Sequence, residues 1–552
     1  MIMKLTTVFL VYSFLLVQLQ SQWISNIPGS ATGDLSISNA RGLAIAVDNS
    51  EYSYVTGYIS NENTGNDIVL IKYDPEGDTV WMKYYNGTED SDDEGCAISL
   101  GSDGSIYVVG TVRNNFTGRD IIVLKYKSTG ELEWASNYSY LSVYADDIGN
   151  DLVVDNNGNI YITGSSKNSA GNTILITQKY SADGTQIWSS FEEYIEGSSG
   201  GVKIACDDSG NSYVVGYIPR ESSTDIIVLK YDASGNVVFR QTSGGEGEDK
   251  AWGIAVDDDS FIYITGYHTN SSFDTDCYTA KYDSTGVLVW EQNFDGTGNS
   301  EDKAWGIAVD DDAVYITGSS TDLTNNVNFV TIKYDLSGNT EWTSFYDGTG
   351  NGRDQANAIG LIEQNGSTTA IAVVGESWGV NGNYDYAAVR YNSSTGSELS
   401  VNRYSMSETT DDIAVDLAIS VQNGKIYLTG YSQLIIESMF RSSSITSVMY
   451  LPLNSEIKNN EVNVPHSFEL KQNYPNPFNP STKISFSIPQ NSQLSLVVYD
   501  LLGRTVDVLL QGELKAGNYE LEYSNSSLSS GVYFYELKAG SFRDIKKMVL
   551  LK

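Results

Sequence analysis

The stretch WGIAVDDDSFIYITGYHTNSSFDTDCYTAKYDSTGVLVW, residues 252–290, decides the fold of this chain. It holds three short apolar segments, WGIAVD (252–257), IYITG (262–266) and TAKYD (279–283), and a fourth that opens near Trp290. Each segment is rich in β-branched or aromatic residues and is bounded by Asp, Gly, Ser or Thr, which is the pattern of a strand between turns. The stretch therefore predicts four short strands.

The same arrangement repeats along the chain at a period of about fifty residues. The segment equivalent to IYITG occurs as SYVTG (53–57), IYVVG (106–110), IYITG (160–164), SYVVG (212–216), IYITG (262–266), VYITG (314–318), IAVVG (371–375) and IYLTG (426–430). A four-stranded unit repeated at this period is the signature of a β-propeller, in which each unit forms one blade. The expected fold class is therefore all-β, with a propeller of four-stranded blades.

The two ends of the repeat region complement each other. The eighth copy lacks a Trp-led fourth strand, whereas residues 23–48 align with residues 290–310 as a fourth strand followed by a first strand. A strand beginning near Trp23 would complete the last blade and cover strand edges that could otherwise pair with other chains. We therefore favour eight blades, and seven stays open because the seventh copy is irregular and lacks its Trp.

Charge is distributed unevenly along the 552 residues, whose formal net charge is −37. Residues 467–552 hold nine Lys/Arg and eight Asp/Glu, so the preceding part carries −38, and a domain boundary is expected between the two. A field this negative repels phosphate backbones, so nucleic acid is not an expected partner.

The repeats resemble those of the secreted bacterial β-propeller family (SBBP-type repeats). The resemblance rests on the Val/Ile-Thr-Gly motifs and on the Lys-Tyr-Asp motifs such as LIKYD (70–74) and VLKYD (228–232). It covers roughly residues 23–455 and implies a fold, with little information on activity.

The tail has a different character and carries four of the nine prolines within residues 467–489. Alternating segments such as GVYFYELKAG (531–540) follow, and they suit a small β-sandwich. The motifs NYPNPFNP (473–480) and YDLLGR (499–504), with Gly531-Val532-Tyr533, resemble those of the type A sorting domain of the type IX secretion system. The resemblance implies export from a Gram-negative bacterium of the Bacteroidetes–Chlorobi group, with the secretion machinery as a partner.

Four segments are therefore expected. A signal peptide spans residues 1–21, because Lys4 precedes an apolar run too short to cross a bilayer comfortably. The propeller spans 22–455, a linker 456–466 and the sorting domain 467–552. The mature chain is expected to have no transmembrane segment and to be secreted or held at the cell surface.

Six aspartates precede first strands at matching positions and are the candidate ligands for a cation. They are Asp93, Asp147, Asp249, Asp302, Asp354 and Asp412. Loops rich in carboxylates could bind Ca²⁺, but none follows the spaced pattern of a calcium loop, and an Asp that fixes a turn explains them as well. We favour the turn, assign no metal or cofactor residue, and leave calcium as the alternative.

Cysteine and histidine offer no catalytic or metal framework. Cys96, Cys206 and Cys277 are too widely spaced for a CxxC site, and we interpret Cys96 and Cys206 as small buried residues of first strands. His268 stands without a partner at ligand spacing and is expected in a loop. No catalytic residue is assigned.

One face of the propeller is the expected binding surface. Loops from second to third strands, and from fourth strands to the next blade, look longer than the other hairpins, often near ten residues. They would share a face with the acidic loops and with Tyr58, Tyr217, Tyr267 and Tyr431. Exposed aromatics on an acidic surface suit a glycan or a basic protein.

The favoured function is therefore an exported binding or scaffold module with a glycan or protein ligand. One alternative is an extracellular polysaccharide hydrolase or lyase that uses carboxylates on the long-loop face, for which the irregular seventh copy, with Glu376, Trp378 and Tyr384, is the place to look. A structural component of the surface layer is the other alternative.

Overall fold

The computed structural model describes residues 21–28, 39–61, 63–140, 145–194, 197–221, 223–298, 300–364, 366–407, 409–436, 440–450, 458–459, 467–479, 481–490, 492–514, 517–524, 530–540 and 542–551. It forms two compact units, one of Gln22–Pro452 and one of Leu453–Lys552 with Met1–Ser21. The expected signal peptide and linker lie almost entirely outside the described residues. Among the residues that are described, no helix could span a membrane.

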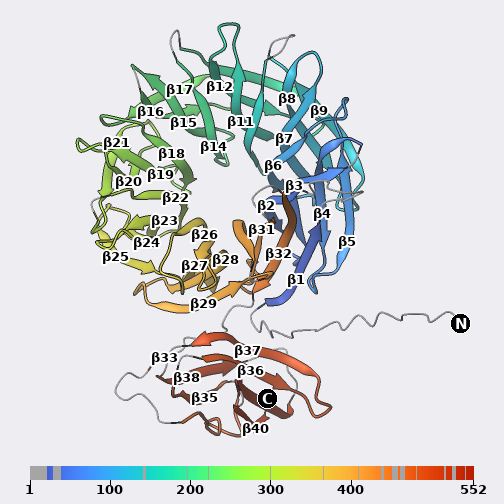
Figure 1. Ribbon diagram of the computed structural model, residues 1–552, viewed down its shortest axis with the longest axis vertical. Helices are drawn as coiled ribbons and strands as arrows, with labels where there is room; N and C mark the ends of the chain where they lie inside the picture. Colours follow the sequence, from blue (N-terminus) through green and yellow to red (C-terminus); the bar gives the residue numbers. More distant parts are fainter. Residues whose placement is uncertain are drawn as a thin grey trace, which may run out of the picture. The chain divides into compact units, whose positions relative to one another are not determined.

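The first unit is a ring of eight antiparallel sheets, each with four strands in the described residues (Figure 1). The first strands are β2 (Ala40–Val47), β6 (Glu94–Leu100), β10 (Ile148–Val154), β14 (Gly200–Cys206), β18 (Lys250–Val256), β22 (Lys303–Val309), β26 (Asp354–Gln364) and β30 (Thr410–Ile419). The second strands are β3 (Ser53–Asn61), β7 (Ile106–Asn114), β11 (Ile160–Lys167), β15 (Ser212–Arg220), β19 (Ile262–Thr269), β23 (Ala313–Thr321), β27 (Ser367–Trp378) and β31 (Ile426–Ile436).

The outer half of each blade completes the expected order. The third strands are β4 (Gly65–Tyr73), β8 (Gly118–Tyr126), β12 (Thr173–Tyr180), β16 (Ser223–Tyr231), β20 (Thr275–Tyr282), β24 (Val327–Asp335), β28 (Tyr384–Asn392) and β32 (Phe440–Tyr450). The fourth strands are β5 (Thr79–Tyr85), β9 (Leu132–Tyr138), β13 (Gln186–Glu192), β17 (Val237–Ser243), β21 (Leu288–Phe294), β25 (Thr340–Tyr346), β29 (Glu398–Tyr404) and β1 (Ser21–Pro28). Blades one to eight are numbered here by their first strands.

Blade eight confirms the predicted closure of the ring. Its strand order is β1-β32-β31-β30, so the N-terminal strand supplies the fourth strand that the eighth copy lacks. Trp23 on β1 is 7% exposed and packs on Tyr73 of blade one, with ring centroids 5.4 Å apart. Eight blades are therefore formed, including the irregular seventh.

Second and third strands are buried on both faces because neighbouring blades cover them. Residues 53–57 of β3 and 67–73 of β4 are all buried. A strand covered on both sides needs apolar or small residues at successive positions, which explains the continuous apolar runs of these segments. Fourth strands such as β21 keep alternating exposed residues instead.

Every first strand carries a β-bulge at the same place. The pairing with the second strand skips one residue, for example between Gly42 and Ala44 in blade one and between Ala251 and Gly253 in blade five. The skipped residues are Leu43, Cys96, Asn150, Val202, Trp252, Trp305, Asn357 and Val415. A bulge re-aims neighbouring side chains, and here it does so around the centre of the ring.

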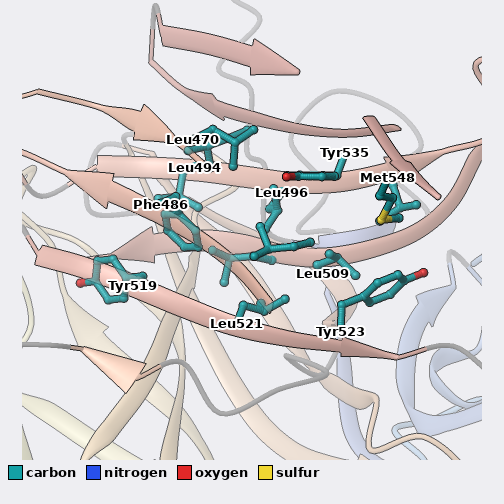
Figure 2. Packing of buried hydrophobic residues seen from close by; sticks show 14 of the residues in the cluster. Leu470, Phe486, Leu494, Leu496, Leu509, Tyr519, Leu521, Tyr523, Tyr535 and Met548 are labelled. Carbon is teal, nitrogen blue, oxygen red and sulfur yellow. The ribbon is translucent and has the colours of Figure 1, made fainter. Parts of the chain in front are cut away.

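The second unit contains the expected small β-sandwich. One sheet has the order β33 (Lys458–Asn459), β38 (Gly517–Ser524), β35 (Ser481–Ile488) and β34 (Glu469–Leu470). The other has the order β37 (Thr505–Leu514), β36 (Ser492–Tyr499), β39 (Gly531–Ala539) and β40 (Phe542–Leu550). Figure 2 shows side chains of both sheets meeting in one core, among them Phe486 and Leu521 from one and Leu496 and Tyr535 from the other.

The proline-rich segment of the tail is held by hydrogen bonds to this sandwich. The Tyr535 hydroxyl accepts a hydrogen bond from the backbone N–H of Asn473 at 2.6 Å and donates one to the carbonyl of Lys471 at 2.8 Å. Asn476 accepts a hydrogen bond from the backbone N–H of Val549 on β40 at 2.9 Å. The proline-rich segment therefore has a structural role, because these bonds pack it against the last strands.

Candidate functional site

The Lys-Tyr motifs at the ends of the third strands hold neighbouring blades together. Lys72 of blade one donates a hydrogen bond to the carbonyl of Ser128 in the outer hairpin of blade two, at 3.3 Å, and the Trp81 indole donates to the same carbonyl at 3.3 Å. The Lys72 ammonium also lies 5.0 Å from the ring centroid of Tyr54. Equivalent lysine bonds come from Lys125, Lys179, Lys230 and Lys281. The repeated lysines are therefore occupied by blade contacts.

The hairpin glycines complete the same contact. Gly130 has φ +81°, and a Cβ at this position would lie 2.9 Å from the Trp81 ring of the preceding blade. Gly77 faces Trp23 in the same way across the closure of the ring. Only glycine suits both the positive φ and the close approach of the ring. Hairpins between third and fourth strands carry the pattern D-x-x-G-x-x-x-W in several blades, as in DPEGDTVW (74–81), and these contacts explain it by turn formation and packing.

Of the six aspartates expected before the first strands, four lie in the loops that join blades, whereas Asp354 begins β26 and Asp412 lies within β30. Each is at most 1% exposed. Asp302 accepts hydrogen bonds from the backbone N–H of Gly296 at 2.5 Å and of Thr321 at 3.0 Å, and Asp249 and Asp354 repeat both bonds. This geometry fits the turn-fixing interpretation, since each carboxylate is used by the loop that it closes.

Burial raises the pKa of all six aspartates, and the shift is large for three of them. Burial raises the pKa of Asp93 and Asp147 to about 6 and that of Asp412 to about 7, while the hydrogen bonds that they accept act in the opposite direction. Their negative charge is therefore costly in the folded protein, because desolvation penalises the charged form.

A different acidic cluster lies between blades five and six. Carboxylate oxygens of Asp274, Asp276 and Asp295 lie within 4.8 Å of one another. None of these residues belongs to the six aspartates that the sequence offered for calcium. Acidic surface groups often gather without a metal, so the cluster alone does not define a calcium site.

The tyrosines expected to form an exposed aromatic face are covered instead. Tyr267 is 6% exposed, and Tyr58, Tyr217 and Tyr431 are half-buried. The guanidinium of Arg41, from the first strand of the next blade, lies 4.1 Å from the ring centroid of Tyr431. Such cation–π contacts join blades, so the expectation of exposed rings is corrected at these positions.

The loop lengths also differ from the expectation. Second and third strands continue almost to their turn, so β15 ends at Arg220 and β16 begins at Ser223. The connection to the next blade is longer, as between Tyr85 and Glu94. Among the described residues, the longer loops join fourth strands to the next blade, although β29 ends at Tyr404 and β30 already begins at Thr410.

His268 lies in strand β19, which corrects the expected loop position. Its ring stacks on Tyr278 with centroids 3.5 Å apart, and its Nε2 lies 3.2 Å from the Ser243 hydroxyl. Burial lowers the pKa of His268 to about 4, so the ring is neutral at physiological pH.

None of the three cysteines forms a disulfide. Cys206 lies on first strand β14 and Cys96 on first strand β6, as expected, but both are half-buried rather than buried. Burial raises the pKa of the Cys96 thiol to about 12, so little reactive thiolate forms at neutral pH.

The irregular seventh copy forms a packed loop. Trp378 and Tyr384 meet edge to face with ring centroids 4.8 Å apart, and Gly352 leaves room for the Trp378 ring. Burial raises the pKa of Glu376, while Arg353 acts in the opposite direction. These contacts explain the irregular sequence by packing and do not select a catalytic role.

A cavity of about 450 Å³ lies at the centre of the ring, lined by the first strands at the level of their bulges. Its polar lining residues include Asp151 of blade three, Lys203 of blade four and Asp416 of blade eight. Trp252 of blade five and Trp305 of blade six line it as well. This volume falls within the range of roughly 300–1,000 Å³ for small-molecule sites. We call this the central channel.

Its charged side chains are held in place by backbone groups of neighbouring blades. Asp151 accepts hydrogen bonds from the backbone N–H of Ile204 at 2.9 Å and from Lys203 Nζ at 3.3 Å. Asp416 accepts one from the backbone N–H of Ile45 at 3.0 Å. The Asp151 carboxylate raises the pKa of Lys203, and Asp416 adds to this effect. The channel therefore presents one ammonium, paired with Asp151, and a second carboxylate at Asp416.

The sequence contains a signal for this channel that the sequence analysis above did not use, namely unusual residues at equivalent positions of the first strands. The first-strand words are LAIAVD (43–48), CAISLG (96–101), NDLVVD (150–155), VKIACD (202–207), WGIAVD (252–257), WGIAVD (305–310), NAIGLI (357–362) and VDLAIS (415–420). The second residue of these segments is Ala or Gly except at Asp151, Lys203 and Asp416. The first residue is Trp only in blades five and six. Comparing equivalent positions of the first strands would have revealed these exceptions to the repeat.

Two family models match the chain. The model of the secretion system C-terminal sorting domain matches residues 472–551. The β-propeller repeat model matches residues 140–169 and 239–274. Both agree with the resemblances that the sequence showed, and with the propeller and sandwich described above.

Other similarities are partial or distant. A regulatory protein FlaEY of Caulobacter vibrioides is 25% identical over 159 residues, covering 25% of this chain and 16% of that protein. The chain thus matches about a sixth of that relative. Among solved structures, a glucose dehydrogenase is 11% identical over 50% of this chain and 92% of its own, with a TM-score of 0.28. A puromycin hydrolase is 9% identical over 72% and 59%, with a TM-score of 0.37. These scores carry no argument about activity.

The sorting domain establishes where the chain goes. Its match over residues 472–551 marks a secreted or cell-surface protein of a Bacteroidetes-type bacterium, exported with the type IX secretion machinery. The propeller is therefore the exported cargo, and its central channel is the candidate functional site.

Proposed function

We propose that the propeller is an exported binding module whose ligand, a glycan or a surface protein, enters the central channel. One observation carries this proposal: the repeats depart from their pattern around the channel, at Asp151, Lys203 and Asp416 and at the two tryptophans. Where a repeat fold needs only packing, Ala or Gly suffices, as the other copies demonstrate. Asp151 and Asp416 bond to backbone N–H groups of the next blade, but the other copies form the same fold without a charge at this position, which favours a selected role.

The rest of the repeated polar residues support the same assignment by elimination. The lysines of the third strands bond to the next blade, and the aspartates before the first strands bond to their own loops. These groups are occupied within the protein. In contrast, the Lys203 side chain is 47% exposed although it lies inside the ring. A ligand that reaches the channel can contact it without breaking the blades.

The test is binding of the full chain to a glycan array and to a set of purified basic proteins. The variant Lys203→Met/Asp416→Asn is compared with Lys127→Met, which alters an exposed lysine of the blade-two hairpin. We expect saturable binding by the wild-type and control chains and at least tenfold weaker binding by the channel variant, with equal melting temperatures. Binding that is the same in all three chains, or absent in all, would overturn the proposal.

A further inference from the structure

The channel has an unusual balance of charge. Lys203 lies on the first strand of blade four and Asp416 on the first strand of blade eight, and these blades face each other across the ring (Figure 1). Lys203 contacts Asp151 of blade three at 3.3 Å. The three side chains together carry a net charge of −1. The lining therefore holds one ammonium, paired with Asp151, and a second carboxylate at Asp416.

This balance disfavours charged ligands of either sign. An anion would approach Lys203 beside the Asp151 carboxylate, within a protein of net charge −37. A cation would meet the ammonium of Lys203, which is paired with Asp151. A charged ligand that displaced Lys203 from Asp151 would also give up this ion pair. An uncharged ligand with many hydroxyl groups meets neither barrier.

The polar trio suits hydroxyl groups in particular. A carboxylate accepts hydrogen bonds only, and an ammonium donates only, so the channel offers acceptors for hydroxyl hydrogens at Asp151 and Asp416 and a donor to hydroxyl oxygens at Lys203. Asp151 and Asp416 are already oriented by backbone N–H groups of Ile204 and Ile45. Such preorganisation reduces the entropy lost on binding.

The tryptophans supply the second half of the site. The rings of Trp252 and Trp305 have centroids 5.0 Å apart with an interplanar angle of 47°, and both line the channel. Gly253 and Gly306 follow them in the sequence and also line the channel. The face of an indole is electron-rich, and it attracts the weakly positive C–H groups of a sugar ring.

We propose that the central channel binds an uncharged sugar ring, the end or a short segment of a neutral glycan, which packs on Trp252 and Trp305 and bonds through its hydroxyls to Asp151, Lys203 and Asp416. This inference rests on the proposed binding function and names the ligand class for the same channel. The size of the cavity, about 450 Å³, limits the inserted part to a few rings at most. Longer polymers would continue outside the channel.

The test is isothermal titration calorimetry of the full chain with three matched probes. These are neutral gluco-, galacto- and manno-oligosaccharides, the corresponding oligosaccharides ending in glucuronate, and those ending in glucosamine. Intrinsic tryptophan fluorescence is recorded in parallel. We expect at least one neutral series to bind tenfold or more tightly than its acidic and amino counterparts, with a change in fluorescence.

Variants locate the site. Trp305→Leu and Asp416→Asn are expected to weaken binding at least tenfold, whereas Trp378→Leu and Lys127→Met, outside the channel lining, are expected to bind as wild type. The melting temperature of each variant shows whether it folds. A folded Asp416→Asn chain keeps the test decisive if Trp305→Leu does not fold.

The outcomes separate this inference from the proposal on which it rests. Channel-dependent binding of an acidic sugar, an amino sugar or a basic protein would overturn the neutral-sugar inference and leave the channel as the binding site. Sugar binding that survives both channel substitutions would overturn both. Absence of binding to every sugar probe would also overturn the inference.

Discussion

The junctions between blades and the central channel are built from the same repeats but use them differently. At the junctions the same residue types recur in blade after blade, as with Lys72 and Trp81 or Lys281 and Trp290, and they make the same contacts. Around the channel the positions that face inward differ from blade to blade, and three of them are charged. Uniform residues serve the ring as a whole, whereas varied residues make one place in it unlike the others.

The comparison teaches that repetition by itself does not indicate a site. The acidic loops and the tyrosines attracted attention in the sequence because they recur. In the structure they prove to be the parts that every blade needs, because each blade must fix its loop and hold its neighbour. Residues that interrupt the repeat at one position are better candidates for function than residues that define it.

The strongest test of the junctions removes the residue that closes the ring. Trp23→Ala should destabilise the protein by about 3–5 kcal/mol, the usual cost of truncating a large buried aromatic. Trp23 is 7% exposed and packs against Tyr73 and Tyr427 from the two blades that it joins. Urea unfolding measures the change. A loss below about 1 kcal/mol would contradict the claim that β1 is needed to hold the ring closed.

The buried aspartates predict that stability depends on pH. The pKa of Asp93 is raised to about 6 in the folded state, so between pH 4 and 6 the folded protein holds a proton that the unfolded chain releases. Stability contributed by this group therefore falls as pH rises through that window. One pH unit of displacement is equivalent to about 1.4 kcal/mol, so ionisation of Asp93 removes on the order of 1–3 kcal/mol of stability by pH 7.

The check is the free energy of unfolding of wild type and Asp93→Asn between pH 4 and 8. The variant should show a flatter dependence, while Asp311→Asn, an exposed residue in the turn between β22 and β23, should follow wild type. An unchanged slope in Asp93→Asn would refute the role of burial at this junction.

A pair of glycines separates backbone strain from contact between blades. Gly235 and Gly104 both have positive φ, at +84° and +79°. A Cβ at Gly235 would lie 2.7 Å from Trp188, whereas at Gly104 nothing lies within 4 Å. Both changes to Ala should destabilise the protein, and Gly235→Ala by about 1–3 kcal/mol more, because of overpacking. Equal losses in thermal unfolding would mean that the Trp188 contact contributes nothing.

Much of the fold was predictable from the sequence. The period, the Trp-led fourth strand and the alignment of residues 23–48 with 290–310 depend on local patterns that recur, so the missing strand of blade eight could be assigned to β1. The tail could be recognised because its words are distinctive, although Asn473 and Asn476 act by packing that segment onto the sandwich.

The channel could not be predicted in the same way. The bulge at Val202 decides whether Lys203 points into the packed core between blades or into the channel at the centre of the ring. A one-residue bulge cannot be recognised in a short apolar segment of sequence. His268 and the tyrosines after each Thr-Gly were misplaced for a related reason. The second strands continue past the glycine, so these residues remain inside the sheet rather than in a loop.

The most direct test of the account compares one substitution at two lysines, Lys230→Met and Lys203→Met. Lys230 donates to the carbonyl of Ser284 in the next blade at 2.9 Å, whereas Lys203 lies in the channel beside Asp151. We predict that Lys230→Met lowers the free energy of unfolding by about 1–2 kcal/mol, the order of a charged hydrogen bond, and leaves ligand binding intact. Lys203→Met should change stability by less than about 1 kcal/mol and weaken binding at least tenfold. If Lys203→Met left binding unchanged, or if both substitutions affected binding equally, the division between structural junctions and functional channel would be wrong.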